Sequence, residues 1–123
     1  MKSNSKDSPL VFDNLQNGAW HYNHNIVEVQ KTGENGEVQT SFDYDQVKVW
    51  GVPTQREIIK AVIAEKWDVT QEIDLANDNK RFELGLSDDV TLRDKYIAYL
   101  NEIDAIKSMV EQDFITYADQ LNQ

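Results

Sequence analysis

His21 and His24 are the only histidines of the chain, and imidazole is the side chain best suited to proton transfer and metal binding near neutral pH. Both lie in a run of aromatic and β-branched residues, which predicts a β-strand. Residues three apart on a strand point to opposite faces, so these two cannot hold one ion unless a bulge separates them. No Ser nucleophile flanks either of them. We therefore interpret both as ordinary strand residues.

Asp43 and Asp45 lie on one face of a predicted strand, which is one requirement of paired-carboxylate chemistry. A hard cation would need several further oxygen ligands, and the local sequence does not supply them. We interpret the two aspartates as a polar face opposite Phe42 and Tyr44. The segment 74–79 superficially resembles a calcium loop, but it lacks the alternating ligands, the central Gly and the terminal Glu.

The glycines are scattered at turn positions, so no phosphate-binding loop is present, and the absence of Cys excludes disulfides and thiolate chemistry. Trp20, Trp50 and Trp67 could form a stacking surface, but we favour core or hairpin packing for them. The sequence predicts no catalytic residue, no cofactor and no metal site, and we expect a protein that is not an enzyme.

The chain carries a formal charge of −10, which disfavours binding to nucleic-acid phosphates. A solvated acidic surface or a basic protein partner fits this charge better. No apolar run reaches the ~18 residues of a membrane helix, and the polar start 1–7 lacks the apolar core of a secretory signal. We expect a cytoplasmic or virion-associated protein whose partner is another protein or a second copy, with neither a membrane nor nucleic acid bound directly.

The length of 123 residues suits one domain. Residues 1–17 are polar apart from Leu10, Val11 and Phe12, and we expect a largely flexible tail that contributes at most one short strand. Residues 18–123 are expected to form a single α+β domain. In it a long antiparallel β-hairpin over residues 18–52 packs against three helices over residues 53–120, the last of them long.

The hairpin prediction rests on two β-rich runs, 20–30 and 38–50, on either side of Asn35-Gly36, the strongest short hairpin signal. With those two residues as the loop, Val29 lies opposite Phe42 and Val27 opposite Tyr44. These four then share an apolar face near the hairpin tip.

Closer to the base of the hairpin, Tyr22, Val47 and Val49 lie on the other face, so both strands change their apolar side near Asn25 and Gln46. Either a bulge or strong twist lies there, or the base and the tip of the hairpin pack on different partners. We slightly favour the second explanation, because both strands change at the same level.

Three helices are predicted by their caps. Thr54 with Glu57 and Asp68 with Gln71 fit capping boxes, and the acidic residues before Val90 suit the start of a third helix. Gly85 fits a left-handed stop after the second helix. The first helix has a strong apolar stripe through Ile58, Ile59, Val62, Ile63 and Trp67. The second has a weaker one at Val69, Ile73, Ala76 and Phe82.

The third helix carries a heptad-like seam, widened by Leu100 and made of Leu92, Tyr96, Tyr99, Ile103, Ile106 and Val110. The seam is either the core-facing side of an ordinary helix or a contact between molecules. The opposite side is acidic and should be solvated. The candidate protein-interaction residues are the four at the hairpin tip and five of the seam, namely Val27, Val29, Phe42, Tyr44, Tyr96, Tyr99, Ile103, Ile106 and Val110.

Three segments resemble small uncharacterised proteins of phages and prophages of gut anaerobes, and similar helical text occurs near the C-termini of phage tail and tail-assembly accessory proteins. The residues that match the recurring patterns are Val47, Val49, Trp50, Pro53 and Thr54, then Ala61, Val62, Ile63, Lys66, Trp67 and Asp68, then Tyr96, Tyr99, Leu100 and Lys107. The resemblance covers roughly 100 residues, excludes the tail, and implies a structural or assembly role without catalytic residues.

Two functions therefore compete, with a small enzyme as a distant third. The first is a phage-type protein–protein interaction module, acting as a tail component or an assembly accessory, with a second copy of the chain as one candidate partner. The second is an acidic inhibitor that mimics nucleic acid on a basic host protein. It would use a ridge of carboxylates drawn from Asp94, Glu102, Asp104, Glu111 and Asp113.

Overall fold

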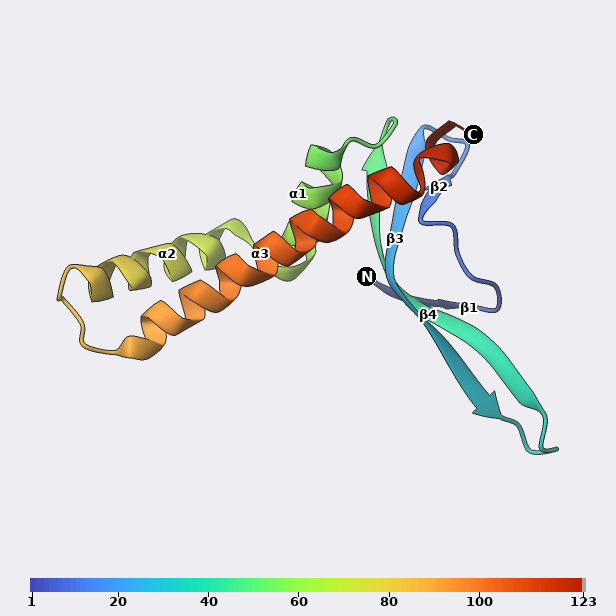
Figure 1. The fold of residues 1–123 in the computed structure, drawn as a ribbon, viewed down its shortest axis with the longest axis horizontal. Coiled ribbons are helices and arrows are strands. Elements are labelled where there is room, and N and C mark those ends of the chain that lie inside the picture. The colour runs from blue at the N-terminus through green and yellow to red at the C-terminus, as the bar shows by residue number, and fades with distance from the viewer. Residues whose placement is uncertain (123) are drawn as a thin grey trace.

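The computed structural model describes residues 1–122 and has the predicted α+β fold. It has one antiparallel sheet, three α-helices and a final short 3-10 helix, and the second α-helix lies along the third, away from the sheet (Figure 1). The strands are β1 Lys2–Ser5, β2 Phe12–Asn14, β3 Ala19–Thr32 and β4 Val38–Trp50. The helices are α1 Gln55–Lys66, α2 Val69–Glu83, α3 Val90–Thr116 and η1 Ala118–Asn122.

The sheet has the order β1-β4-β3-β2, so the first residues of the chain supply both of its outer strands. β1 pairs with residues 42–45 of β4, and β2 pairs with residues 20–22 of β3. The expectation that residues 1–17 form a tail outside the domain is therefore wrong. Tertiary contacts hold this segment in the domain, because Phe12 is fully buried in the main core, where it packs against Tyr22 and Phe114.

The β3–β4 hairpin is present, but its register differs from the prediction. Its loop runs over residues 33–37, so Val29 lies opposite Ser41 and Val27 opposite Asp43. Between the pairs His24–Asp45 and Val27–Asp43, two residues of β3 face only Tyr44 of β4. This is a β-bulge, and Asn25 within it has a left-handed φ of 52°. The bulge keeps Val27 and Val29 on the face of Tyr22, so only β4 changes its apolar side, at Phe42 and Tyr44. A bulge is therefore present, which is the explanation we did not favour.

The helix boundaries follow the predicted caps. Thr54 accepts a hydrogen bond from the Glu57 amide, and Asp68 and Gln71 form a reciprocal capping box. The Asp89 side chain caps α3 by accepting from the Thr91 amide. Gly85 adopts a φ of 74° directly after α2, as a left-handed stop requires. Trp67 alone separates α1 from the cap of α2.

The apolar core lies at the centre of the molecule, where α1 and the second half of α3 cover the base of the hairpin. It is formed by Val11, Phe12, Trp20, Tyr22, Val47, Val49, Ile58, Val62, Ile106 and Val110. Two projections diverge from it, the helices to the left and the hairpin tip to the lower right (Figure 1). We call residues 26–44 of the hairpin the β-ribbon, and the antiparallel pair made by α2 and the first half of α3, residues 69–104, the helical arm.

Candidate interaction surfaces

The two histidines lie on neighbouring levels of β3 in different surroundings. His24 is buried and its ring stacks on that of Tyr22, with centroids 4.8 Å apart. Its Nδ1 lies 3.4 Å from the Tyr22 carbonyl oxygen. Burial lowers the pKa of His24 below its usual value, against opposing effects of that carbonyl and of Asp45. His21 is half-buried beside Asp13 of β2, and burial lowers its pKa as well.

Asp45 lies directly across the ladder from His24, so the structure brings together one of the predicted histidines and one of the predicted aspartates. Its carboxylate accepts a hydrogen bond of 2.9 Å from Asn25 Nδ2 and lies 3.1 Å from Lys2 Nζ. Partial desolvation, the largest single effect, raises the pKa of Asp45, but Asn25 and Lys2 together outweigh it and hold that pKa below its usual value. Asp43 is exposed and accepts a hydrogen bond of 2.6 Å from Asn4.

An open hollow of about 390 Å³ beside His24 is also lined by Asp45, Glu65 and Lys66. Within it, a neutral imidazole faces a carboxylate that Lys2 and Asn25 already engage. Among residues 1–122 no three His, Cys, Asp or Glu side chains are placed to hold a metal ion. The arrangement provides a proton acceptor but positions no nucleophile beside it.

The β-ribbon carries four of the predicted interaction residues, but it does not place them on one face. Val27 and Val29 lie on the side of their cross-strand neighbours Asp43 and Ser41, whereas Phe42 lies opposite Glu28 on the other side. Val27 is 57% exposed, and Val29, Phe42 and Tyr44 are half-buried. The predicted four-residue apolar face is therefore divided between two faces.

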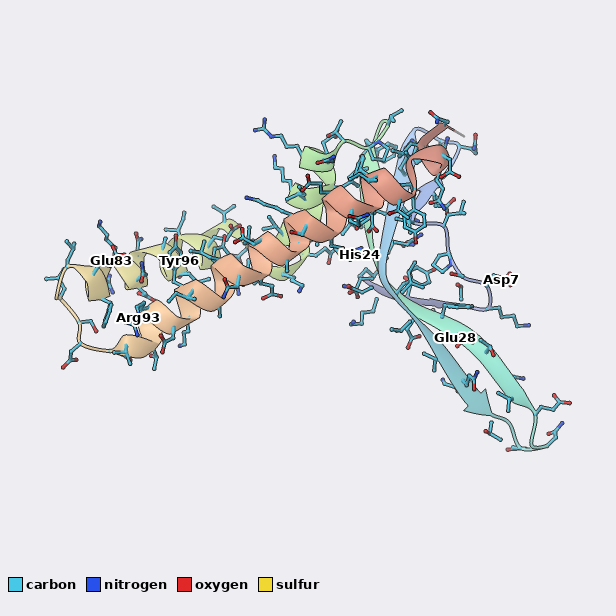
Figure 2. All side chains as sticks on the ribbon, in the orientation of Figure 1. Asp7, His24, Glu28, Glu83, Arg93 and Tyr96 are labelled. Carbon is cyan, nitrogen blue, oxygen red and sulfur yellow. The ribbon has the colours of Figure 1, made fainter. Side chains whose placement is uncertain are left out.

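Both edges of the β-ribbon are open toward its tip. β1 covers β4 only over residues 42–45, and β2 covers β3 only over residues 20–22. Residues 26–32 and 38–41 therefore have one unpaired edge each. Figure 2 shows Glu28 well away from the helices, whereas His24 lies where α3 crosses the hairpin.

The predicted seam of α3 is covered within the chain itself. Ile103, Ile106 and Val110 are buried, the last two in the main core. Tyr96 and Tyr99 are half-buried in the helical arm, where the Tyr99 ring packs edge-on against Trp67 and its hydroxyl donates to Glu72. The seam is thus the core-facing side of the helix, and none of its deeper residues is available to a partner.

The acidic residues of α3 form no continuous ridge of free carboxylates. Glu102 is paired with Lys66 at 2.5 Å, and Asp94 lies 3.4 Å from Arg93. Asp113 accepts a hydrogen bond from the buried Tyr22. Three of the five predicted carboxylates are therefore engaged within the chain, which weighs against their use as phosphate mimics.

The helical arm has an exposed apolar surface that the sequence analysis did not single out. Val69 and Ile73 of α2 and Ile97 and Leu100 of α3 are all exposed. The apolar stripe of α2 and the widening of the α3 seam at Leu100 were the signals for it. They could not show what lies against it, because periodicity reports that a side is apolar, not what covers it.

No protein family, curated protein or solved structure matches the chain. Among residues 1–122, no helix combines the length and apolar character that crossing a membrane requires. The interpretation of the chain therefore rests on its own geometry.

Proposed function

We propose that this chain is a non-enzymatic protein–protein interaction module and that the β-ribbon is the part that binds a partner. The phage-derived structural or tail-assembly role implied by the sequence resemblance is our proposal for its setting. The observation that carries the proposal is the β-ribbon itself, a two-stranded extension beyond the core with two open edges and an exposed Val27.

An extension of this kind adds little to the stability of the monomer. A two-stranded ribbon is at best marginally stable by itself, and open edges favour unwanted pairing. A partner that adds a strand to one edge would satisfy the unpaired backbone groups. An open hollow of about 450 Å³ beside Val27, lined also by Asn25 and Tyr44, could receive a side chain of that partner.

The test compares the proteins captured from source cells by the intact chain and by ribbon variants. Val27→Asp combined with Val29→Asp should abolish capture of a specific protein that the original chain retains. Gln30→Lys, an exposed change on the same strand, should keep it. Binding of the purified candidate must then show the same order by calorimetry, and the circular dichroism of all variants must match.

The identity of the captured protein separates the two functions. A tail or assembly protein held through the β-ribbon supports the proposal. A basic nucleic-acid-binding protein that is lost on Asp104→Asn and Glu111→Gln, and unaffected by the ribbon variants, would favour the acidic inhibitor. If no captured protein depends on the β-ribbon, the proposed function is wrong.

A further inference from the structure

The helical arm has an inner side, where α2 and α3 touch, and an exposed side next to it. On the inner side the Tyr99 hydroxyl donates to Glu72. Arg93 follows the half-buried Leu92 and lies at the edge of this side, with its guanidinium 5.3 Å from the Phe82 ring centre. Asn79 is buried and Tyr96 half-buried. These contacts fix which positions of each helix face the other.

Each exposed apolar residue is the next residue in the sequence after one of those inner positions. Ile73 follows Glu72 in α2, and Ile97 and Leu100 follow Tyr96 and Tyr99 in α3. Both helices are right-handed and they run in opposite directions, so positions that follow the contact positions fall on the same side of the pair. That side is the flank patch, which consists of Val69, Ile73, Ala76, Ile97 and Leu100.

We propose that the flank patch binds the flank patch of a second copy of this chain, with the two helical arms antiparallel. A two-fold axis across the arms places α3 on α3 and α2 on α2. On α3, the axis passes halfway between Arg93 and Asp104, so Arg93 of each copy meets Asp104 of the other. The same point is halfway between Ile97 and Leu100. On α2, the corresponding axis pairs Ile73 with Ala76.

The two axes agree with the packing of the arm. In α2, a point halfway between Ile73 and Ala76 is also halfway between Lys80 and Val69, the neighbour of Asp68. The contacts Glu72–Tyr99 and Phe82–Arg93 place this point beside the corresponding point of α3. A single two-fold operation therefore brings apolar residues together at the centre of the interface and opposite charges together at both of its ends.

Both ends of the arm are apolar as well. The free end exposes Leu84 and Leu86, at 61% and 75%. At the body end, an open, mainly apolar groove of about 540 Å³ is lined by Ile59, Ile63, Trp67 and Val69. In the antiparallel arrangement the free end of one copy lies over this groove of the other. One two-fold arrangement therefore covers the apolar surfaces at both ends of the arm, which favours a second copy over an unrelated partner.

The size of the patch sets the expected strength. α2 has fifteen residues, hence a length of about 22 Å, and two helices side by side are about 20 Å wide. A face of that size lies at the lower end of specific interfaces. The structure therefore points to a dimer that dissociates on dilution.

The test is the mass of the intact chain by sedimentation over about a hundredfold range of concentration, since dimer populations follow mass action. The expected result is a monomer–dimer equilibrium. Ile73→Glu and Leu100→Glu should each raise the dissociation constant about tenfold or more, because they bury a charge at the centre. Ala98→Glu, an exposed change on the other side of the same helix, should leave it unchanged.

A charge exchange makes the test specific for the antiparallel arrangement. Arg93→Glu and Asp104→Arg should each weaken the dimer, and the two together should restore it. A monomer at every concentration, or equal effects of Leu100→Glu and Ala98→Glu, would overturn the inference. The proposed function is tested separately, because Val27→Asp with Val29→Asp should leave the dimer intact, and the flank-patch variants should still bind the ribbon's partner.

Discussion

The hydroxyl of Tyr22 in β3 donates a hydrogen bond of 2.5 Å to the Asp113 carboxylate in α3, 91 positions further along the chain. The Tyr22 ring is fully buried in the core and stacks on His24. Burial and the neighbouring carboxylate raise the pKa of Tyr22 far above its usual value, so the hydroxyl remains a donor at all ordinary pH values. The bond therefore ties the base of the hairpin to the last helix.

Tyr22→Phe should lower the free energy of unfolding by about 2 kcal/mol, because hydrogen bonds to charged groups contribute about 1.5–3 kcal/mol. Urea unfolding measures the loss. Asp113→Asn serves as the second variant of a double-mutant cycle, and the two losses should add to clearly more than that of the double variant. Strict additivity would show that the bond contributes nothing measurable.

The bulge at Asn25 predicts a dependence on residue type at one backbone position. A left-handed conformation costs an ordinary L-residue about 1–2 kcal/mol, whereas Gly adopts it freely and Asn tolerates it. Asn25→Val should therefore unfold at clearly lower denaturant than Asn25→Gly. Both variants lose the same hydrogen bond to Asp45, so their difference isolates the backbone effect. Equal stability of the two variants would contradict this account.

The hairpin shows what the sequence could and could not predict. Asn35-Gly36 correctly indicated a turn, but Gly33 donates to the Glu37 carbonyl and closes a longer loop, which shifts every pair near the tip by one residue. The bulge shifts the pairs at the base of the hairpin by one further residue. Apolar alternation predicted that both strands change face, whereas in the structure only β4 does so. It could not reveal a bulge, because a change of packing partner produces the same pattern.

The helices and the first residues differ in predictability for a physical reason. Caps such as Asp68 with Gln71 are local interactions, so their spacing alone predicted where the helices begin. The placement of residues 1–17 depends on distant contacts: the Phe12 amide donates to Gln120 Oε1, and the Asn23 amide donates to the Val11 carbonyl. No local pattern encodes such contacts. The apolar patch at Leu10, Val11 and Phe12 suggested one short strand, but the polar residues of β1 gave no sign of a second.

Phe12→Ala should lower the free energy of unfolding by about 3–5 kcal/mol, since truncation of a buried Phe loses its transfer energy and leaves a cavity. The ring contacts Tyr22 and Phe114, with centroids 5.4 and 4.8 Å away. Leu10→Ala, at a more exposed position of the same segment, provides the control and should cost far less. If both variants unfolded at the same denaturant concentration, β2 would not belong to the cooperative core.

His24 should make the stability decrease as the pH falls below about 6.5. Burial, the largest effect, lowers its folded pKa below that of the unfolded chain, about 6.5. As the pH falls, the unfolded chain therefore takes up the proton first, and the stability present above pH ~6.5 decreases toward the lowered folded pKa. His24→Gln, which has no titrating group, should flatten this part of the curve. The folded pKa of the more exposed His21 is lowered too, so His21→Gln should flatten it less. Identical curves for His24→Gln and the original chain would show that the His24 imidazole is not held neutral by its burial.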